Sequence, residues 1–151
     1  MLATSSTSVG STEQRTYLPN ISWQLFEDLL AEIGDVGIPR LAYYQGNLEL
    51  MTPLFAHENS NRLIDRVIST LAEEAELEYT PAGSMTIKRP ELAVGKEPDS
   101  CYYIQNEHLV RNKIRLDFTE DPPPDLAVEV DITHTAIDQL ALYATLGVPE
   151  L

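Results

Sequence analysis

The stretch Pro-Pro-Asp-Leu-Ala-Val-Glu-Val-Asp-Ile, residues 123–132, decides the fold expected for this chain. Large apolar residues alternate along it with acidic or small ones, and a period of two rich in β-branched side chains predicts a β-strand. One face of that strand should pack into a core, and it consists of Leu126, Val128, Val130 and Ile132.

The opposite face of this strand carries three carboxylates, on Asp125, Glu129 and Asp131. Side chains two residues apart point the same way, so these like charges repel unless a positive charge lies among them. A divalent cation is one solution, because hard cations prefer carboxylate oxygens. A solvated acidic face on a half-exposed sheet is the other, and this strand alone leaves both open.

A second acidic strand is predicted at residues 97–104, Glu-Pro-Asp-Ser-Cys-Tyr-Tyr-Ile. If it neighbours the first, Asp99 and Glu129 meet across the sheet and form a site for Mg²⁺ or Mn²⁺. Such an ion lowers the pKa of bound water and stabilises charge on a phosphoryl oxygen. Glu129 is the strongest single candidate, because an unpaired charge in the middle of an apolar strand is expensive to bury.

The composition predicts one globular domain at residues 17–151, after a disordered Ser- and Thr-rich tail at residues 1–16. The formal net charge of −14 argues against a broad basic surface for nucleic acid or membrane. It leaves room for a nucleic-acid enzyme whose local groove and bound metal make the contact. The single cysteine, Cys101, and the absence of a signal-peptide pattern predict a reducing, cytoplasmic location.

The remaining patterns predict an α/β or α+β fold in which helices flank a sheet. Ser22 and Gly34 bound an amphipathic helix at residues 23–33, and a long helix at 57–78 has apolar residues spaced by three and four. The other expected elements are a hairpin at 41–51 that turns at Gly46-Asn47, a strand at 84–88, a loop around Gly95, a short strand near 114–118 and a last helix at 136–146.

Four motifs follow one another in order along the chain. They are Leu-Glu-Leu-Met-Thr-Pro at 48–53 with His57 after it, Glu-Pro-Asp at 97–99, Pro-Asp-Leu-Ala-Val-Glu-Val at 124–130, and Leu-Tyr-Ala-Thr-Leu-Gly-Val-Pro-Glu at 142–150. Jointly they are specific, and the chain resembles the Uma-type restriction endonuclease family. That family is common in cyanobacteria and belongs to the PD-(D/E)xK nuclease superfamily. The resemblance extends from about residue 23 to the end.

The resemblance implies a restriction-endonuclease-like central mixed β-sheet flanked by helices, with an N-terminal helix and hairpin. It implies a metal-dependent endonuclease that hydrolyses phosphodiester bonds in nucleic acid, DNA being the expected substrate. Mg²⁺ or Mn²⁺ would be the cofactor, and a homodimer is expected because two-fold pairing lets two sites cut two strands. Asp99 and Glu129 would hold the metal, with the carbonyl of Val130 as a further ligand.

Glu49 and His57 would approach the same cleft, although Glu49 could equally be a surface residue and His57 a helix-start residue without chemistry. The superfamily's lysine is missing. In Uma-type members it stands four residues before the tyrosine that matches Tyr143, and here that position is Gln139. An amide can hydrogen-bond a water but supplies no positive charge.

Lys88 and Lys96, close to Asp99 in the sequence, are candidates to replace the missing cation. Two functions from different classes therefore stay open: an endonuclease with weakened activity, or a catalytically inactive nuclease-fold module that dimerises or binds a partner. A small hydrolase acting on another phosphate ester is a third.

Overall fold

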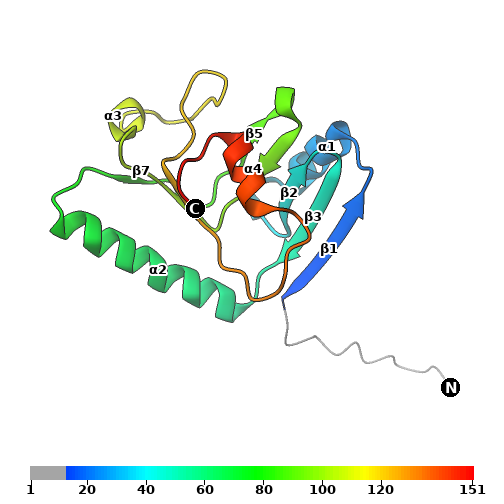
Figure 1. Ribbon diagram of the computed structural model, residues 1–151, viewed down its shortest axis with the longest axis horizontal. Helices are drawn as coiled ribbons and strands as arrows, with labels where there is room; N and C mark the ends of the chain where they lie inside the picture. The colour runs from blue at the N-terminus through cyan, green and yellow to red at the C-terminus, as the bar shows by residue number, and fades with distance from the viewer. Residues whose placement is uncertain (1–12) are drawn as a thin grey trace.

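The computed structural model describes residues 13–151 and contains two β-sheets with helices around them (Figure 1). The strands are β1 (Gln14–Pro19), β2 (Arg40–Tyr44), β3 (Asn47–Thr52), β4 (Thr80–Pro81), β5 (Ile87–Arg89), β6 (Val94–Lys96), β7 (Ser100–Tyr103) and β8 (Leu126–Val128). The helices are α1 (Trp23–Ile33), α2 (Phe55–Glu74), α3 (Glu107–Val110) and α4 (Gln139–Leu146), with 3₁₀ turns η1 (Gly34–Val36) and η2 (Pro90–Leu92).

The strands are divided between a five-stranded sheet, β1-β3-β2-β6-β5, and a three-stranded sheet, β4-β7-β8. All pairings between these strands are antiparallel, and a single parallel bridge joins Leu126 to Glu150. The α+β class with flanking helices, predicted from the sequence, is confirmed. Both sheets are antiparallel, and the parallel pairing in the described residues is the isolated bridge between Leu126 and Glu150.

Helix α1 has the bounds predicted from its caps. Ser22 Oγ accepts a hydrogen bond from the Leu25 amide at 3.2 Å, and Gly34 ends the helix. The hairpin that follows turns one residue earlier than expected, at Gln45-Gly46. Both of these residues have positive φ, 48° and 84°, as the twisted two-residue hairpin turn requires.

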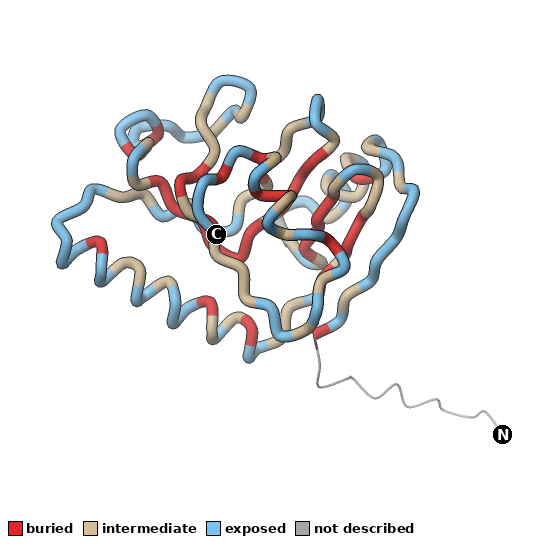
Figure 2. Tube along the Cα trace, viewed as in Figure 1, coloured by how far each residue is buried: buried red, intermediate tan, exposed pale blue. Residues whose placement is uncertain are grey.

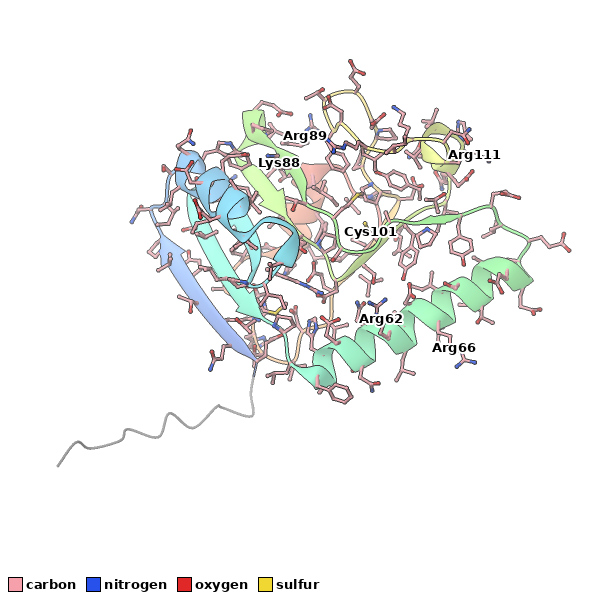
Figure 3. The ribbon with its side chains drawn as sticks, turned by 180° about the vertical axis from the view of Figure 1, so that it is seen from behind. Arg62, Arg66, Lys88, Arg89, Cys101 and Arg111 are labelled. Atoms are coloured by element: carbon pink, nitrogen blue, oxygen red, sulfur yellow. The ribbon has the colours of Figure 1, made fainter. Side chains whose placement is uncertain are left out.

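Two apolar cores lie on opposite faces of the five-stranded sheet, because successive side chains of β2 point to opposite sides. Leu41 and Tyr43 pack with Phe26 of α1 on one face, while Ala42 packs with Leu142 of α4 on the other. Figure 1 accordingly shows α4 in front of the strands, and Figure 3, seen from behind, shows α1 in front.

The expected loop around Gly95 is instead the middle of β6. A Cβ at this position would lie 2.6 Å from Cε1 of Phe26, so the strand can pass beneath the aromatic ring only with glycine there. The glycine therefore reflects close packing between α1 and the sheet, which sequence reasoning took for a turn signal.

Both acidic strands are shorter than predicted. The face of residues 123–132 that was expected to be buried is also wrong. Residues 97–99 are the crossing from β6 in one sheet to β7 in the other, and β8 ends at Val128. Ala127 is the residue of β8 that is fully buried, whereas Ile132 is 48% exposed. The Val130 amide donates to the Asp99 carboxylate instead of continuing a strand ladder.

Helix α2 forms as its period predicts, but it ends at Glu74 (Figures 1 and 2). Its contacts with the rest of the domain are made mostly by polar side chains. His57, Asn61 and Ala72 are its only buried residues. The apolar stripe that marks the helix in the sequence faces outward, with Leu71 64% exposed.

Three further expectations are corrected. Residues 114–118 form an irregular loop, with Ile114 99% exposed, because no strand pairs with them within residues 13–151. Helix α4 starts at Gln139, since Asp138 caps it by accepting from the Ala141 amide. Of the tail predicted at 1–16, residues 1–12 lie outside the described part, while 14–16 belong to β1 because they pair with the free edge of β3. No described helix is both long and apolar enough to cross a membrane.

Candidate functional site

Asp99 and Glu129 lie just outside two neighbouring strands, β7 and β8. In the antiparallel pairing of β7 with β8, Ser100 lies opposite Val128. One step further in this register, just beyond the ends of both strands, Asp99 and Glu129 are opposite each other. The site therefore lies at the end of the three-stranded sheet, where residues 97–99 connect it to β6 of the five-stranded sheet.

The Asp99 carboxylate is buried, at 3% exposure, and both of its oxygens have partners. Oδ1 accepts a short hydrogen bond from the guanidinium of Arg40 on β2. Oδ2 accepts from the Val130 amide at 2.7 Å and lies 3.1 Å from Nε2 of His57. Arg40 also binds Glu58 Oε1 at 2.9 Å, so the ion pair joins the hairpin, the site and the first turn of α2.

Helix α2 is tied to this site through Asn61. Its amide nitrogen donates to the Asp99 carbonyl at 3.1 Å, and its amide oxygen accepts from Ser100 Oγ at 3.0 Å. One turn further along, Asp65 accepts from the Tyr102 hydroxyl at 2.6 Å. These hydrogen bonds fix the rotation of α2 about its own axis and place His57 at Asp99.

Glu129 is held by a lysine and a tyrosine. Lys96 Nζ lies 3.2 Å from Oε2, and the Tyr143 hydroxyl donates a short hydrogen bond to Oε1. The Lys96 side chain is only 4% exposed, so the ion pair is shielded from solvent. Burial, together with the charge of Glu129, raises the pKa of Tyr143 well above its usual range, which keeps its hydroxyl a donor.

Gln139, where the resemblance to the Uma-type family would place a lysine, is the first residue of α4 and shares a helix face with Tyr143 one turn later. Both polar atoms of its amide are buried, and neither has a hydrogen-bond partner within residues 13–151. Buried amides in native proteins nearly always bind something. This amide is therefore free to bind a water or a ligand on the Glu129 side of α4.

A second cluster of acids surrounds Arg15 of β1. Its guanidinium binds Glu13 at 3.0 Å, Glu49 at 2.7 Å and Asp131 at 2.5 Å. Although burial opposes it, hydrogen bonds to Glu13 and Glu49 raise the pKa of Arg15 above its ordinary value. The arginine thus neutralises acids that β1, β3 and the segment after β8 bring together.

Glu49 is buried, which decides against the surface interpretation. Besides Arg15, it accepts from Thr135 Oγ1 at 2.8 Å and from the Ala136 amide at 2.9 Å. These contacts hold the segment that leads into α4. Glu49 positions the loop between Glu129 and Gln139 and makes no contact with Asp99.

His57 lies between the two clusters. Its ring is fully buried, with Nε2 3.1 Å from Asp99 Oδ2 and 3.7 Å from Glu13 Oε1. Neither ring nitrogen, nor Glu13 Oε1, makes a hydrogen bond of good geometry to another described residue. Burial opposes the change, but hydrogen bonds from Thr133 and Arg15 hold the pKa of Glu13 below its usual value, so this acid is charged beside the histidine.

An open pocket of about 820 Å³ adjoins the site on the Arg40 side. Arg40, Glu58, Glu97 and Lys88 are among the residues that line it. Burial raises the pKa of Glu97, although Arg40 and Lys96 act against this shift. The pocket gives a ligand access to the guanidinium that binds Asp99.

The three carboxylates predicted for the 123–132 strand do not share one site. Asp125 accepts from the Ile104 and Asn106 amides at 2.7 and 2.9 Å and so caps a loop. Glu129 binds Lys96, and Asp131 binds Arg15. The positive charges required among these acids are therefore protein cations, which sequence reasoning did not place.

Three further side chains, of Lys88, His134 and Cys101, make no hydrogen bond or ion pair with Asp99 or Glu129 within the described residues. Lys88 binds Glu27 of α1 at 2.8 Å, and His134 is on an exposed loop. Cys101 is a buried thiol, and burial raises its pKa to about 12. Sequence reasoning missed Arg40, although an arginine opening an otherwise apolar strand was a usable signal.

The carboxylate oxygens at the site are the type of ligand that a hard divalent cation prefers. Within residues 13–151 no three acidic, histidine or cysteine side chains are placed to hold a metal together. Mg²⁺ needs fewer, because it binds through one or two carboxylates and keeps several waters. Asp99 and Glu129 are two carboxylates that could serve in this way, and their present charge partners are Arg40 and Lys96.

Comparison with known proteins gives one match. The family model Uma2, described as "Putative restriction endonuclease", matches residues 23–151. No curated protein and no solved structure matches the chain. Restriction-endonuclease-like families generally use divalent metals, and a nuclease family implies a nucleic-acid substrate. The order of the motifs, the crossing at Asp99 and the extent of the match lead to one conclusion: the chain belongs to the Uma2 family.

Proposed function

We propose that this protein is a metal-dependent endonuclease that hydrolyses phosphodiester bonds in DNA, with Lys96 in the role of the superfamily's lysine. The observation that carries the proposal is the buried contact of 3.2 Å between Lys96 Nζ and Glu129 Oε2. It supplies the site with the positive charge that Gln139 lacks. The charge comes from β6 instead of α4.

Asp99, Glu129 and the carbonyl of Val130 would hold Mg²⁺ or Mn²⁺. When bound, such an ion lowers the pKa of water and stabilises charge on a phosphoryl oxygen. Arg40 and Lys96 keep the two carboxylates ionised and oriented, because a buried acid stays charged only when a cation faces it.

Lys96 would serve the reaction as a fixed positive charge next to Glu129. A cation at this place attracts the scissile phosphate and stabilises the negative charge that grows in the transition state. The unpartnered amide of Gln139 is suited to orient the attacking water. His57, 3.1 Å from Asp99, is within reach to hold or pass a proton.

Nicking of supercoiled plasmid with Mg²⁺ or Mn²⁺ tests the proposal. Glu129→Ala should abolish the metal-dependent activity, and Lys96→Met should lower its rate by about 10²–10³, the cost of removing one charge-stabilising group. Lys113→Met is the matched control, because Lys113 pairs with Asp121 and does not line the pocket beside the site, and its rate should equal that of the parent.

Equal losses in Lys96→Met and Lys113→Met would contradict a specific role for Lys96. Gln139→Lys asks a separate question: if Lys96 already supplies the charge, a second lysine should change the rate little.

The second candidate is a nuclease-fold module without catalysis, and one observation favours it. Both candidate metal carboxylates already hold protein cations, Arg40 and Lys96. In that case the parent shows no nicking with any metal and no Mn²⁺ binding that depends on Glu129. Gain of cleavage by Gln139→Lys over a silent parent would then identify an intact fold with decayed chemistry.

A further inference from the structure

The open pocket beside Arg40 is lined in part by exposed apolar side chains. Phe55, the first residue of α2, is 86% exposed, and Val36 and Ile38, which follow α1, are 76% and 51% exposed. All three line the same pocket of about 820 Å³. Single exposed apolar residues are ordinary, but a group of them around one hollow marks a binding site.

Polar groups share the lining of this pocket and connect it to the candidate metal site. Arg40 lines the pocket and binds the Asp99 carboxylate. Ser84, Thr86 and Glu97 line it as well and supply two hydroxyls and a carboxylate as hydrogen-bonding groups. A ligand in the pocket therefore meets apolar surface, hydrogen-bonding groups and a guanidinium that touches a proposed metal ligand.

This combination of groups fits one nucleotide. A nucleobase has two apolar faces and a polar edge, so that it stacks on an aromatic ring and hydrogen-bonds along its rim. A guanidinium suits the attached phosphate, because several of its N–H groups bind phosphate oxygens. The volume of the pocket lies within the range of about 300–1,000 Å³ in which proteins bind small molecules. A phosphate held at Arg40 lies next to Asp99.

Arg62 provides a second cation beside the pocket. It follows Glu58, which lines the pocket, by four residues, so the two lie on the same side of α2. In Figure 3 the side chain of Arg62 points from α2 toward the body, whereas that of Arg66, one turn later, points away. Neither arginine makes an ion pair with another residue in the described range 13–151. Arg62 is therefore suited to a neighbouring phosphate of the same strand.

The net charge of the protein favours a single strand over a duplex. A duplex carries one phosphate charge per about 1.7 Å of its axis, twice the density of a single strand. With a net charge of −14, the protein repels the duplex more strongly. The bases of a duplex are also stacked and paired, so none enters a pocket until it has left the helix at a cost in free energy. An unpaired nucleotide enters without that cost.

We propose that this pocket binds one unpaired nucleotide of single-stranded DNA, with the base stacked on Phe55 and the phosphate at Arg40. Arg62 binds a neighbouring phosphate. The inference rests on the proposed endonuclease function and names the form of DNA that the same site takes. It explains how so acidic a chain binds DNA: stacking in a pocket and a few placed cations replace a broad basic surface.

Fluorescence anisotropy with Ca²⁺ in place of Mg²⁺ measures binding apart from cleavage. A labelled strand of about 15 nucleotides should bind the parent at least tenfold more tightly than its duplex does. Phe55→Ala should weaken binding of the strand about tenfold, the effect of losing one stacked base, and Phe55→Trp should retain it. Tyr17→Ala is the matched control, because Tyr17 is an exposed aromatic residue of β1 that does not line the pocket. It should bind as the parent does.

Two further measurements locate the strand on the protein. A strand that carries 5-iodouracil should crosslink to Phe55 under ultraviolet light, and mass spectrometry of the peptides identifies the residue. Arg62→Gln should reduce the slope of log K against log salt by about 0.7, the share of one phosphate contact with a single strand. Arg66→Gln, one turn away, should leave the slope unchanged.

The outcomes separate this inference from the proposed function. A parent that binds the duplex as tightly as the strand overturns the inference even when it nicks plasmid, and so does a Phe55→Ala variant that binds like Tyr17→Ala. A crosslink that avoids Phe55 does the same. Strand binding that depends on Phe55, in a protein that nicks no plasmid with any metal, supports the nucleotide pocket and overturns the endonuclease instead. Equal salt slopes for Arg62→Gln and Arg66→Gln overturn the phosphate contact of Arg62.

Discussion

The crossing at Asp99 and the outer face of α2 show opposite departures from ordinary burial. At the crossing, charged side chains are buried: Asp99 is 3% exposed and Lys96 is 3% exposed. On the outer face of α2, apolar side chains are exposed: Leu63 and Leu71 are more than half exposed. The two regions share one helix, whose first turn supplies His57 to the first and whose later turns form the second.

The two regions have in common that neither contributes much to the stability of the folded chain. Buried ion pairs are poor stabilisers, because desolvation of both charges offsets most of their attraction, and apolar replacements are often as stable. An exposed apolar stripe likewise adds nothing to a single folded chain. Neither region is explained by the stability of a single folded chain.

The largest effect is expected where a buried charge loses its partner. Arg40→Met leaves the Asp99 carboxylate without its cation, and the free energy of unfolding should fall by about 3–5 kcal/mol. Urea unfolding followed by circular dichroism measures this loss.

The paired change sharpens the same comparison. Asp99→Asn in the Arg40→Met background removes the uncompensated charge and should restore at least half of the lost free energy of unfolding. A double substitution that is as unstable as the sum of the two single ones would show that packing, and not charge, explains the Arg40 effect.

A smaller effect is expected at the second acidic cluster. Glu13→Gln weakens charge-assisted hydrogen bonds to Arg15 and Thr133 and should lower the free energy of unfolding by about 2 kcal/mol at pH 7. Because the pKa of Glu13 is lowered in the folded state, its contribution is complete above the ordinary value of 4.5 and is lost as the pH falls below it.

Thermal melts of the parent and of Glu13→Gln between pH 7 and pH 3 measure this linkage. The two melting temperatures should converge as the pH falls through the acid range. A constant difference across the whole range would mean that the charge of Glu13 does not stabilise the fold.

The smallest effect is expected on the outer face of α2. Val67→Ser should change the free energy of unfolding by no more than about 0.5 kcal/mol, because the Val67 side chain is 57% exposed. The same substitution at Val128, which is half-buried next to the site, serves as the contrast and should cost more. Equal losses at the two positions would remove the distinction between the two regions.

Local signals in the sequence predicted much of the fold. The capped helix at residues 23–33, the hairpin and the helical period of α2 depend on neighbouring residues, and all three form. Errors arose where a distant part of the chain decided the outcome. Gly95 is a strand residue because the Phe26 ring lies over it, and residues 14–16 form a strand because β3 has a free edge.

The sequence by itself determined the family, because family membership follows from residue identity and order. A shared site of Asp99 and Glu129, and the loss of a lysine at Gln139, stay predictions. Only the tertiary structure decided which cation meets which acid: Arg40 meets Asp99, Lys96 meets Glu129, and Arg15 meets Glu49 and Asp131. Residues far apart in the sequence make these ion pairs, and no local period encodes them. Helical periodicity likewise marked the stripe of α2, but only the polar contacts of Asn61 and Asp65 turned it toward solvent.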